Sequence, residues 1–259
     1  MHPILFEAGP VTIYTYGAFI ALGAILGLAY MAGQGKKRFG TSYDQTNSLF
    51  IYIVLAAYLG GKAFFFFEDP AYYAAHLAKL FGGNGFVFFG SLLFAIPAML
   101  WFFKKHGIPA LPMLDVMAIV ACMVHGFGRL GCFMAGCCYG KPTDGVFGVV
   151  FSNPACLAKP LGTPLHPTQL YESGFIFSLM AFLAWLKKRK QFDGQLFLTY
   201  LIVYSAGRGL LETLRGDGER GFIIQNIISH SQFISLLVIL ASVFFYVKLK
   251  GKGKLLHLN

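Results

Sequence analysis

The sequence predicts an all-α integral membrane protein with seven transmembrane helices. Of its 259 residues, 56% are hydrophobic and only 12% are charged, and the mean hydropathy is +0.63. Soluble domains carry about 25% charged residues, so this chain has too few charges to cover a surface that faces water. Its apolar runs reach about twenty residues, the length at which a helix crosses a bilayer. Helices satisfy their own backbone groups in hydrocarbon, whereas membrane strands would give short alternating segments.

Seven apolar segments with few charges are the predicted spans. They cover about residues 14–33, 47–67, 86–103, 112–134, 169–186, 195–214 and 231–249. The first segment lacks the basic start and small-residue cleavage site of a signal peptide, so we expect it to remain as a span. Neither a repeat, a low-complexity tract nor a linker divides the sequence. We therefore expect residues 1–259 to form a single polytopic membrane domain.

The net charge of +10 is concentrated after alternate predicted spans. Basic clusters follow the first, third, fifth and seventh spans, at residues 36–38, 104–105, 187–190 and 248–254. In a seven-helix chain these four clusters lie on one side, which the positive-inside rule makes cytoplasmic. We expect the N-terminus outside and the C-terminus in the cytoplasm. Topology and anionic lipid headgroups explain the positive charge, and we expect no nucleic-acid partner.

Five predicted spans bring polar side chains to one depth, close to the outer interface. These residues are Tyr14, Tyr16, Gly17, Lys62, Arg129, His166, Gln169, Tyr171, Glu172, Arg208 and Glu212. A charge at the centre of a spanning helix costs about 2.5–3.5 kcal/mol on insertion scales. Charges gathered in this way therefore require a structural or functional reason.

Two interpretations of these charges remain open. In the structural one, Lys62 extends its head group to the interface, and the two arginines form salt bridges with Glu172 or Glu212. In the functional one, a polar cavity opens to the outer leaflet, where the forks of Arg129 and Arg208 bind a lipid phosphate. Arg208 and Glu212 are spaced i,i+4 and share a helix face. Glycines beside both arginines would let a ligand approach.

The chain has five cysteines: Cys122, Cys132, Cys137, Cys138 and Cys156. We expect Cys122, in the middle of a span, to be a small buried hydrophobic residue. A disulfide is permitted outside the membrane, and we expect Cys137 or Cys138 to pair with Cys156. The alternatives are a nucleophilic cysteine and a zinc site. That zinc site would comprise His125, Cys132, Cys137 and Cys138, but it lacks the usual paired C-x-x-C spacing. We expect neither a metal nor a cofactor.

Three motifs in sequence order carry a resemblance to a known family. They are GRLGCFMAGCCYG at 128–140, HPTQLYE at 166–172 and YSAGRGLLETLRGDG at 204–218. With this order and spacing, nearly the whole chain resembles the prolipoprotein diacylglyceryl transferase family. The resemblance implies a multi-pass protein of the bacterial cytoplasmic (inner) membrane, with its active site towards the periplasmic or outer face. It also implies transfer of the diacylglyceryl group of phosphatidylglycerol, a membrane lipid, to the lipobox cysteine thiol of a preprolipoprotein signal peptide. A thioether forms and glycerol phosphate is released.

The resemblance also implies roles for individual residues. The catalytic residues expected are Arg129, Arg208, Tyr16 and Glu212. The substrate-binding residues expected are Arg129, Glu172, His166, Gln169, Gly140, Lys62 and Cys132. Arg129 is expected to hold the lipid phosphate and Arg208 to assist the leaving group, although the two roles are exchangeable.

Some positions depart from the family pattern. Cys132 stands where many members have asparagine, and Lys62 where an arginine is usual. Phe89 occupies the position of a histidine that is thought to help as a base, and a phenylalanine takes up no proton. Deprotonation of the thiol then needs another group, with His125 and His166 as candidates. Two alternative functions follow: a relative that transfers a lipid group to another acceptor, and a non-enzymatic protein that binds or transports phospholipid.

Overall fold

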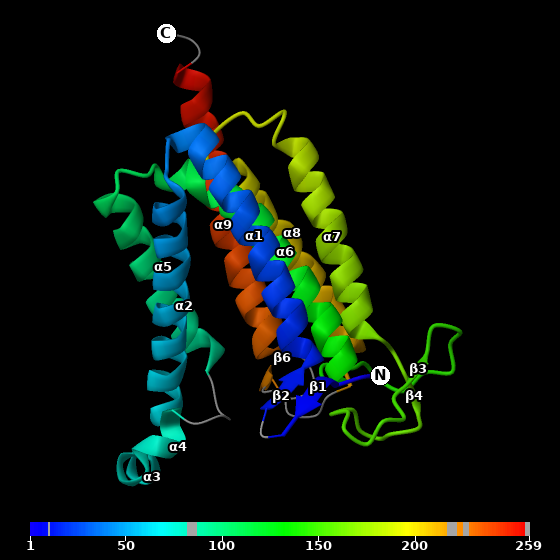
Figure 1. The fold of residues 1–259 in the computed structure, drawn as a ribbon. Helices are drawn as coiled ribbons and strands as arrows, with labels where there is room; N and C mark the ends of the chain where they lie inside the picture. Colours follow the sequence, from blue (N-terminus) through cyan, green and yellow to red (C-terminus); the bar gives the residue numbers. More distant parts are fainter. Residues whose placement is uncertain (10, 82–86, 217–221, 225–227, 257–259) are drawn as a thin grey trace. The chain divides into compact units, whose positions relative to one another are not determined.

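The computed structural model describes residues 1–9, 11–81, 87–216, 222–224 and 228–256 (Figure 1). Its contacts divide the chain into two compact units. The first unit comprises Met1–Tyr30 and Leu114–Asn259, and the second comprises Met31–Met113. The single membrane domain stays a prediction.

Each of the seven predicted spans overlaps an α-helix over most of its described residues. These helices are α1 (Thr15–Phe39), α2 (Tyr43–Phe66), α5 (Phe88–Lys105), α6 (Ala110–Ala135), α7 (Thr168–Leu186), α8 (Gln195–Leu211) and α9 (His230–Leu256). Among the described residues, five helices are long and apolar enough to cross a membrane, namely α1, α2, α6, α7 and α9. This confirms a mostly helical membrane protein. The count of seven spans stays a prediction.

Short elements that the sequence did not predict occur between these helices. They are α3 (Pro70–Ala75), α4 (Leu77–Phe81), the 3-10 helix η1 (Glu212–Leu214), and the strands β1 (Ile4–Ala8), β2 (Val11–Tyr14), β3 (Val149–Val150), β4 (Pro164–Leu165), β5 (Phe222–Ile224) and β6 (Ile228–Ser229). The strands form three antiparallel pairs, β1 with β2, β3 with β4, and β5 with β6. At two to five residues each, the strands are too short to give a clear alternating pattern.

Small residues let the helices of the first unit approach one another closely. A Cβ atom on Gly23 of α1 would lie 3.0 Å from the Cα atom of Val124 in α6. Between α6 and α7, the Ser173 hydroxyl donates to the carbonyl oxygen of Gly126 at 3.0 Å. The buried core of this unit contains Ala118, Ile119, Cys122, Ile176, Leu179, Leu183 and Leu196. Cys122 is therefore the buried hydrophobic residue that was predicted.

A buried carboxylate organises one end of the first unit. Asp115 of α6 is 1% exposed and accepts hydrogen bonds from the backbone N–H groups of Gly194 at 3.0 Å and Phe197 at 3.1 Å. Both groups belong to the start of α8, where a negative charge also interacts favourably with the helix dipole. The ammonium group of Lys190 pairs with the same carboxylate at 3.0 Å and compensates its charge.

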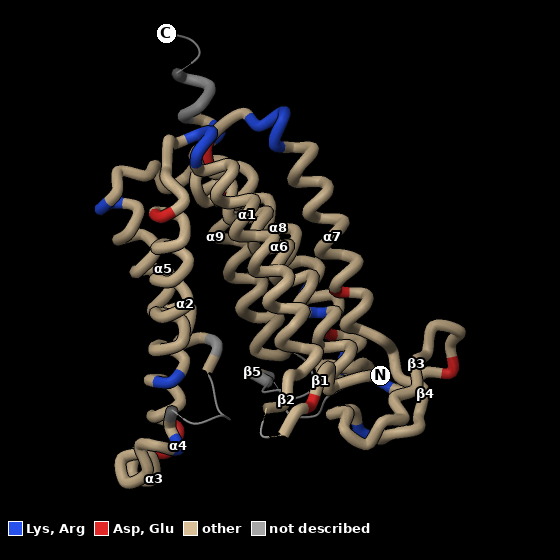
Figure 2. Tube along the Cα trace, in the orientation of Figure 1, with Lys and Arg blue, Asp and Glu red and all other residues tan. Residues whose placement is uncertain are grey.

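The basic residues of this unit gather at the same end. The α7–α8 connection carries the cluster at 187–190 (Figure 2). At the start of α8, the Gln195 side chain donates to the hydroxyl of Tyr246 in the C-terminal half of α9, at 2.9 Å. Lys248 follows Tyr246 by two residues. Two of the basic clusters therefore lie at one end of this unit, as the alternating topology requires.

In the second unit, α2 and α5 cross at two glycines. A Cβ atom on Gly60 would overlap the carbonyl oxygen of Gly90, and a Cβ atom on Gly90 would overlap that of Gly60. A capping box starts α2, because the Ser42 hydroxyl accepts from the N–H of Gln45 while the Gln45 side chain accepts from the N–H of Ser42. Lys62 belongs to this unit and lies in the same stretch of α2 as Gly60.

Candidate functional site

A buried carboxylate forms the centre of the polar group in the first unit. Glu172 of α7 is 4% exposed. Its Oε2 atom lies 3.0 Å from Nε of Arg129, and its Oε1 atom lies 3.4 Å from Nε2 of His125. The hydroxyl of Tyr204 in α8 donates to Oε1 at 3.5 Å. Side chains from α6 and α8 thus meet the carboxylate of α7.

Helical spacing explains why these side chains meet. His125 and Arg129 are four residues apart on α6, so they project from one face, and Nε of Arg129 lies 3.3 Å from Nε2 of His125. The ring of Tyr204 packs edge-on against the His125 ring, with centroids 5.1 Å apart. The His125 ring thus contacts both members of the Arg129–Glu172 ion pair.

A second ion pair lies on α8 and its continuation in η1. Nη1 of Arg208 lies 2.7 Å from Oε2 of Glu212, with the two side chains 14% and 4% exposed. The i,i+4 spacing predicted their shared face. The charges of Arg129 and Arg208 both act on Glu172 and Tyr204, so the two ion pairs belong to one electrostatic group.

Each arginine pairs with a carboxylate, and Arg129 keeps N–H donors that this pairing does not occupy. Arg129 contacts Glu172 and His125 through Nε, and its two terminal amino groups donate to none of the described residues. A guanidinium group offers five donors, so Arg129 retains the two groups that bind a phosphate in a forked geometry. The salt bridges of the structural interpretation are thus present, and they leave donors for an anion.

The described parts of the three sequence motifs meet around Gly140. These parts are residues 128–140, 166–172 and 204–216. The N–H of Gly140 donates to the carbonyl oxygen of His166 at 2.8 Å. A Cβ atom on Gly140 would lie 2.8 Å from the carbonyl oxygen of Leu214, so a side chain here would force the chains apart. An isolated β-bridge joins Gly140 to Arg215.

The start of α7 fixes the loop that precedes Gly140. The buried side chain of Gln169 donates to the carbonyl oxygen of Cys137 at 2.7 Å, and the hydroxyl of Thr168 donates to that of Cys138 at 2.8 Å. The Nδ1 atom of His166 lies 3.3 Å from the hydroxyl of Tyr171. Gln169 and His166 therefore position the loop that precedes Gly140.

Tyr16 lies against the end of α6. A Cβ atom on Gly131 would lie 3.0 Å from the carbonyl oxygen of Tyr16, so the glycine permits this approach. Tyr16 is 41% exposed. It interacts electrostatically with Arg129 and with the cysteines that follow. Tyr16 therefore borders both the arginine and the thiols.

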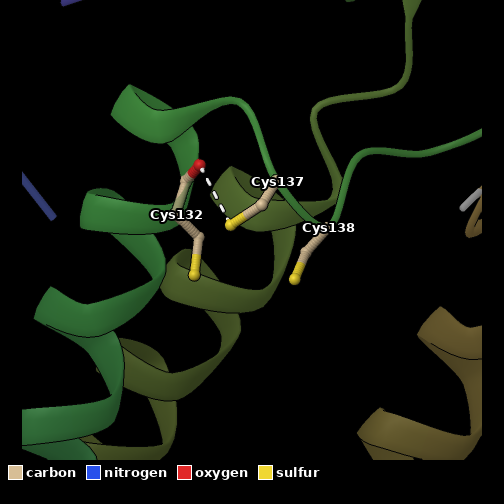
Figure 3. A group of neighbouring side chains, drawn as sticks. All are labelled: Cys132, Cys137 and Cys138. Atoms are coloured by element: carbon tan, nitrogen blue, oxygen red, sulfur yellow. Dashed lines mark hydrogen bonds between the residues drawn. The ribbon is translucent and has the colours of Figure 1, made fainter. Parts of the chain in front are cut away.

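Three cysteines lie together at the end of α6 (Figure 3). The Sγ atoms of Cys132, Cys137 and Cys138 all lie within 4.8 Å of one another. The thiol of Cys137 donates to the carbonyl oxygen of Cys132 at 3.8 Å. His125 of the predicted four-residue zinc site instead contacts Glu172.

The predicted disulfide to Cys156 is not formed, because all five cysteines are free thiols. Cys156 packs in a separate cluster with Phe151, Ala158 and Leu165. The loop that carries Cys137 and Cys138 is held on α7, where their thiols face Cys132. The prediction paired Cys137 or Cys138 with Cys156 because all three lie outside the helices. The loop geometry instead keeps Cys137 and Cys138 away from Cys156.

The surroundings of the loop thiols shift their pKa values in opposite directions. Hydrogen bonds from Cys132 and Cys137, with the charges of Arg129 and Arg215, hold the pKa of Cys138 well below the usual thiol range. The hydrogen bonds of Cys137 with Cys132 and Cys138 raise the pKa of the Cys137 thiol. At Cys156, burial raises the pKa of the thiol. Cys138 is therefore the thiol in this loop that ionises first.

Lys62 and Phe89 lie in the second unit. Lys62 is 4% exposed, and its Nζ atom lies 5.9 Å and 5.8 Å from the ring centroids of Tyr58 and Phe65. Within the described chain, Nζ has no hydrogen-bond partner. Phe89, in the first turn of α5, is exposed. The substrate-binding role of Lys62 stays a prediction.

Several residues that build the site were not predicted from the sequence. Tyr204 contacts the Glu172 carboxylate, and its spacing of four residues from Arg208 was the available indication. Ser173 joins α7 to α6, next to Glu172 in sequence. Arg215 bridges to Gly140 and acts on the charge of Cys138. Its position within the third motif was the only pattern that pointed to it.

Comparison with known proteins gives a consistent result. A sequence model described as prolipoprotein diacylglyceryl transferase matches residues 3–248. The phosphatidylglycerol–prolipoprotein diacylglyceryl transferase of Clostridium tetani is 38% identical over 247 residues, which cover 95% of this chain and 97% of that protein. The second such enzyme of Clostridium perfringens is 34% identical over 98% of each chain.

A more distant relative has the same name. The phosphatidylglycerol–prolipoprotein diacylglyceryl transferase of Dehalococcoides mccartyi is 28% identical and covers 97% of this chain and 95% of its own length. The similarity thus extends over whole chains and includes the segments that carry the two ion pairs and the loop around Gly140. This chain belongs to the prolipoprotein diacylglyceryl transferase family.

Proposed function

We propose that this chain transfers the diacylglyceryl group of phosphatidylglycerol to the lipobox cysteine of a preprolipoprotein. The sulfur atom forms a bond to the glycerol carbon, the bond between that carbon and the phosphate oxygen breaks, and glycerol phosphate leaves. The relatives named for this activity support the proposal. The observation that carries it here is the pair of largely buried ion pairs, Arg129 with Glu172 and Arg208 with Glu212.

The two arginines bind the phosphate and stabilise its departure. Arg129 meets the phosphodiester with its terminal amino groups, while Glu172 fixes the guanidinium group through Nε. Arg208, oriented by Glu212, stabilises the charge that develops on the leaving phosphate oxygen. Such donors are effective because they are already in place before the charge develops and are largely withdrawn from water. The thiol gives up its proton to a base, for which His125 and His166 are the candidates, and His125 belongs to the polar group around Glu172.

The remaining predicted residues shape the substrate sites. Tyr16 is exposed beside the thiols and Arg129, a position that suits contact with the incoming peptide. Cys132 lies about one helical turn beyond Arg129 on α6, and its thiol lies with those of Cys137 and Cys138. Gln169 and His166 hold the loop before Gly140. These contacts support substrate binding through the shape of the loop.

The proposed membrane orientation places this site at the outer face. Seven spans of the bacterial inner membrane, with the N-terminus outside, would put the basic clusters on the cytoplasmic side. Glu172 and the cluster at 187–190 are 15 residues apart along α7 and its end, about 22 Å at a rise of about 1.5 Å per residue. The carboxylate therefore lies towards the opposite end of α7 from the basic cluster, where periplasmic lipid and peptide would be available.

Alanine variants of the two arginines test the proposal. We expect Arg129→Ala and Arg208→Ala to abolish transfer from phosphatidylglycerol vesicles to a lipobox peptide, with Arg38→Ala, an exposed arginine, as the control. Thermal denaturation of each purified variant in detergent measures folding separately. Folded variants that still transfer the lipid at the normal rate would contradict the proposal. Lipid binding without transfer by the unchanged protein would instead favour the binding or transport function.

A further inference from the structure

The proposed transfer gives no chemical role to the three thiols at the end of α6, of which only Cys132 borders the substrate site. Their Sγ atoms lie within 4.8 Å of one another. Zinc binds thiolate sulfur at about 2.3 Å, so tetrahedral geometry places two such sulfurs about 3.8 Å apart. Side-chain rotations that move the sulfurs by about 1 Å therefore suffice to surround one ion. Cys132 is buried, while Cys137 and Cys138 are partly accessible.

We propose that Cys132, Cys137 and Cys138 bind one Zn²⁺ ion and leave its fourth coordination position open to a thiol from outside the chain. Thiolate ligands select soft or borderline metals such as zinc over magnesium and calcium. Three protein ligands with one open position are typical of zinc sites that act on a substrate. Among the described residues, no histidine or carboxylate completes the group.

The loop is organised for such a site by contacts outside the thiols. The side chains of Thr168 and Gln169 bind the carbonyl oxygens of Cys138 and Cys137. Cys138 adopts a left-handed backbone with φ of 61°, a conformation that costs a residue other than glycine about 1–2 kcal/mol. The loop keeps this turn with the three sulfurs on one side of it (Figure 3). Outer contacts of this kind orient metal ligands.

The charge of the surroundings suits this complex. Three thiolates and one Zn²⁺ ion carry a net charge of −1, and the guanidinium group of Arg129 acts on both Cys132 and Cys138. A buried negative charge requires such a partner. The site therefore lies near two positive charges, those of Arg129 and Arg215.

The ligand for the open position is the thiol of the prolipoprotein, and this part of the inference rests on the proposed function. On coordination the S–H bond breaks, a Zn–S bond forms, and the proton passes to water. A coordinated thiol is deprotonated outright, whereas a free thiol with a pKa near 8.5 is largely protonated at neutral pH. The complex would thus hold the acceptor sulfur as a thiolate beside the lipid site.

Metal analysis of the full-length protein tests the site without any substrate. After purification in detergent with reductant and zinc, followed by removal of free metal, we expect about one zinc per chain. Cys132→Ser and Cys138→Ser should lose it, and Cys156→Ser, outside the group, should retain it. Thermal denaturation identifies any variant that fails to fold, and Cys137→Ser provides an independent third variant. Absence of zinc, its retention by folded variants, or a disulfide within the group despite reductant would overturn the proposal.

Cobalt substitution tests the open position. Co²⁺ bound by three thiolates gives a thiolate charge-transfer band, and we expect a lipobox peptide to strengthen it while its Cys→Ser counterpart does not. A band unchanged by the peptide, in protein that transfers lipid, would overturn the open position and leave the proposed function intact. A band that responds to the peptide, in protein without transfer activity, would support the inference and contradict the proposed function.

Discussion

Replacing Glu172 by glutamine separates the charge of this carboxylate from its shape. The carboxylate lies 3.0 Å from Arg129, 3.4 Å from His125 and 3.5 Å from the Tyr204 hydroxyl. The side chains of Glu172 and Arg129 are only 5% and 15% exposed, so water screens their attraction weakly. Glu172→Gln keeps the side-chain length and one acceptor, but it leaves the arginine charge unpaired.

The size of the effect follows from that burial. Two unit charges 4 Å apart attract by about 4 kcal/mol at an effective dielectric constant of 20, and removing one partner of a buried pair costs about 3–5 kcal/mol. Since glutamine retains a hydrogen bond, we expect a loss of about 3 kcal/mol in unfolding free energy. For a chain of this size that lowers Tm by about 6–12 °C. Misplacement of Arg129 should reduce transfer about 100- to 1,000-fold, as for other lost preorganised donors.

The assay compares three proteins under the same conditions. Thermal denaturation in detergent gives Tm, and lipid transfer to a lipobox peptide gives the rate. Glu7→Gln is the matched control, because Glu7 is exposed in β1 and should change neither quantity. A Glu172→Gln protein with unchanged Tm and unchanged rate would refute the argument that this carboxylate holds the arginine.

Three further predictions concern other parts of the chain. Gly60→Ala should destabilise the protein by about 1–3 kcal/mol in chemical denaturation, because the new methyl group overlaps an α5 carbonyl oxygen. Gly33→Ala, which meets nothing within 4 Å, should be neutral or slightly stabilising. Asp115→Asn should cost about 1–3 kcal/mol, since it weakens an acceptor of two α8 N–H groups. In metal-free protein, iodoacetamide should modify Cys138 at a lower pH than Cys156, because the pKa is lowered at the first thiol and raised by burial at the second; equal pH profiles by peptide mapping would contradict this.

The helices were predictable because their cause is local. Runs of about twenty apolar residues with basic ends leave few alternatives to helices in a membrane, and each predicted segment overlaps an α-helix over most of its described residues. The ion pair of Arg208 with Glu212 was predictable for the same reason, because i,i+4 spacing lies within one helix. For Arg129 the sequence left Glu172 and Glu212 both open as partners, since the choice depends on how α6 packs on α7 through Gly126 and Ser173.

The arrangement of the cysteines could not be predicted from the sequence. A pairing with Cys156 was expected because both segments lie beyond the helix, but the contacts of Thr168 and Gln169 hold the loop so that its thiols face Cys132. The left-handed turn at Cys138 carries no glycine that would have indicated it. A local sequence pattern does not predict contacts between residues about 30 positions apart. It also does not predict a left-handed turn at a residue that rarely adopts one.

Mass spectrometry of a lipobox peptide tests the central claim most directly. The peptide is incubated with the purified protein and phosphatidylglycerol vesicles, and the mass of its cysteine is measured. We predict the mass of an added diacylglyceryl group, absent with Arg129→Ala and absent when the peptide cysteine is replaced by serine. An unmodified peptide, in the presence of folded protein that binds the lipid, would contradict transfer to this acceptor.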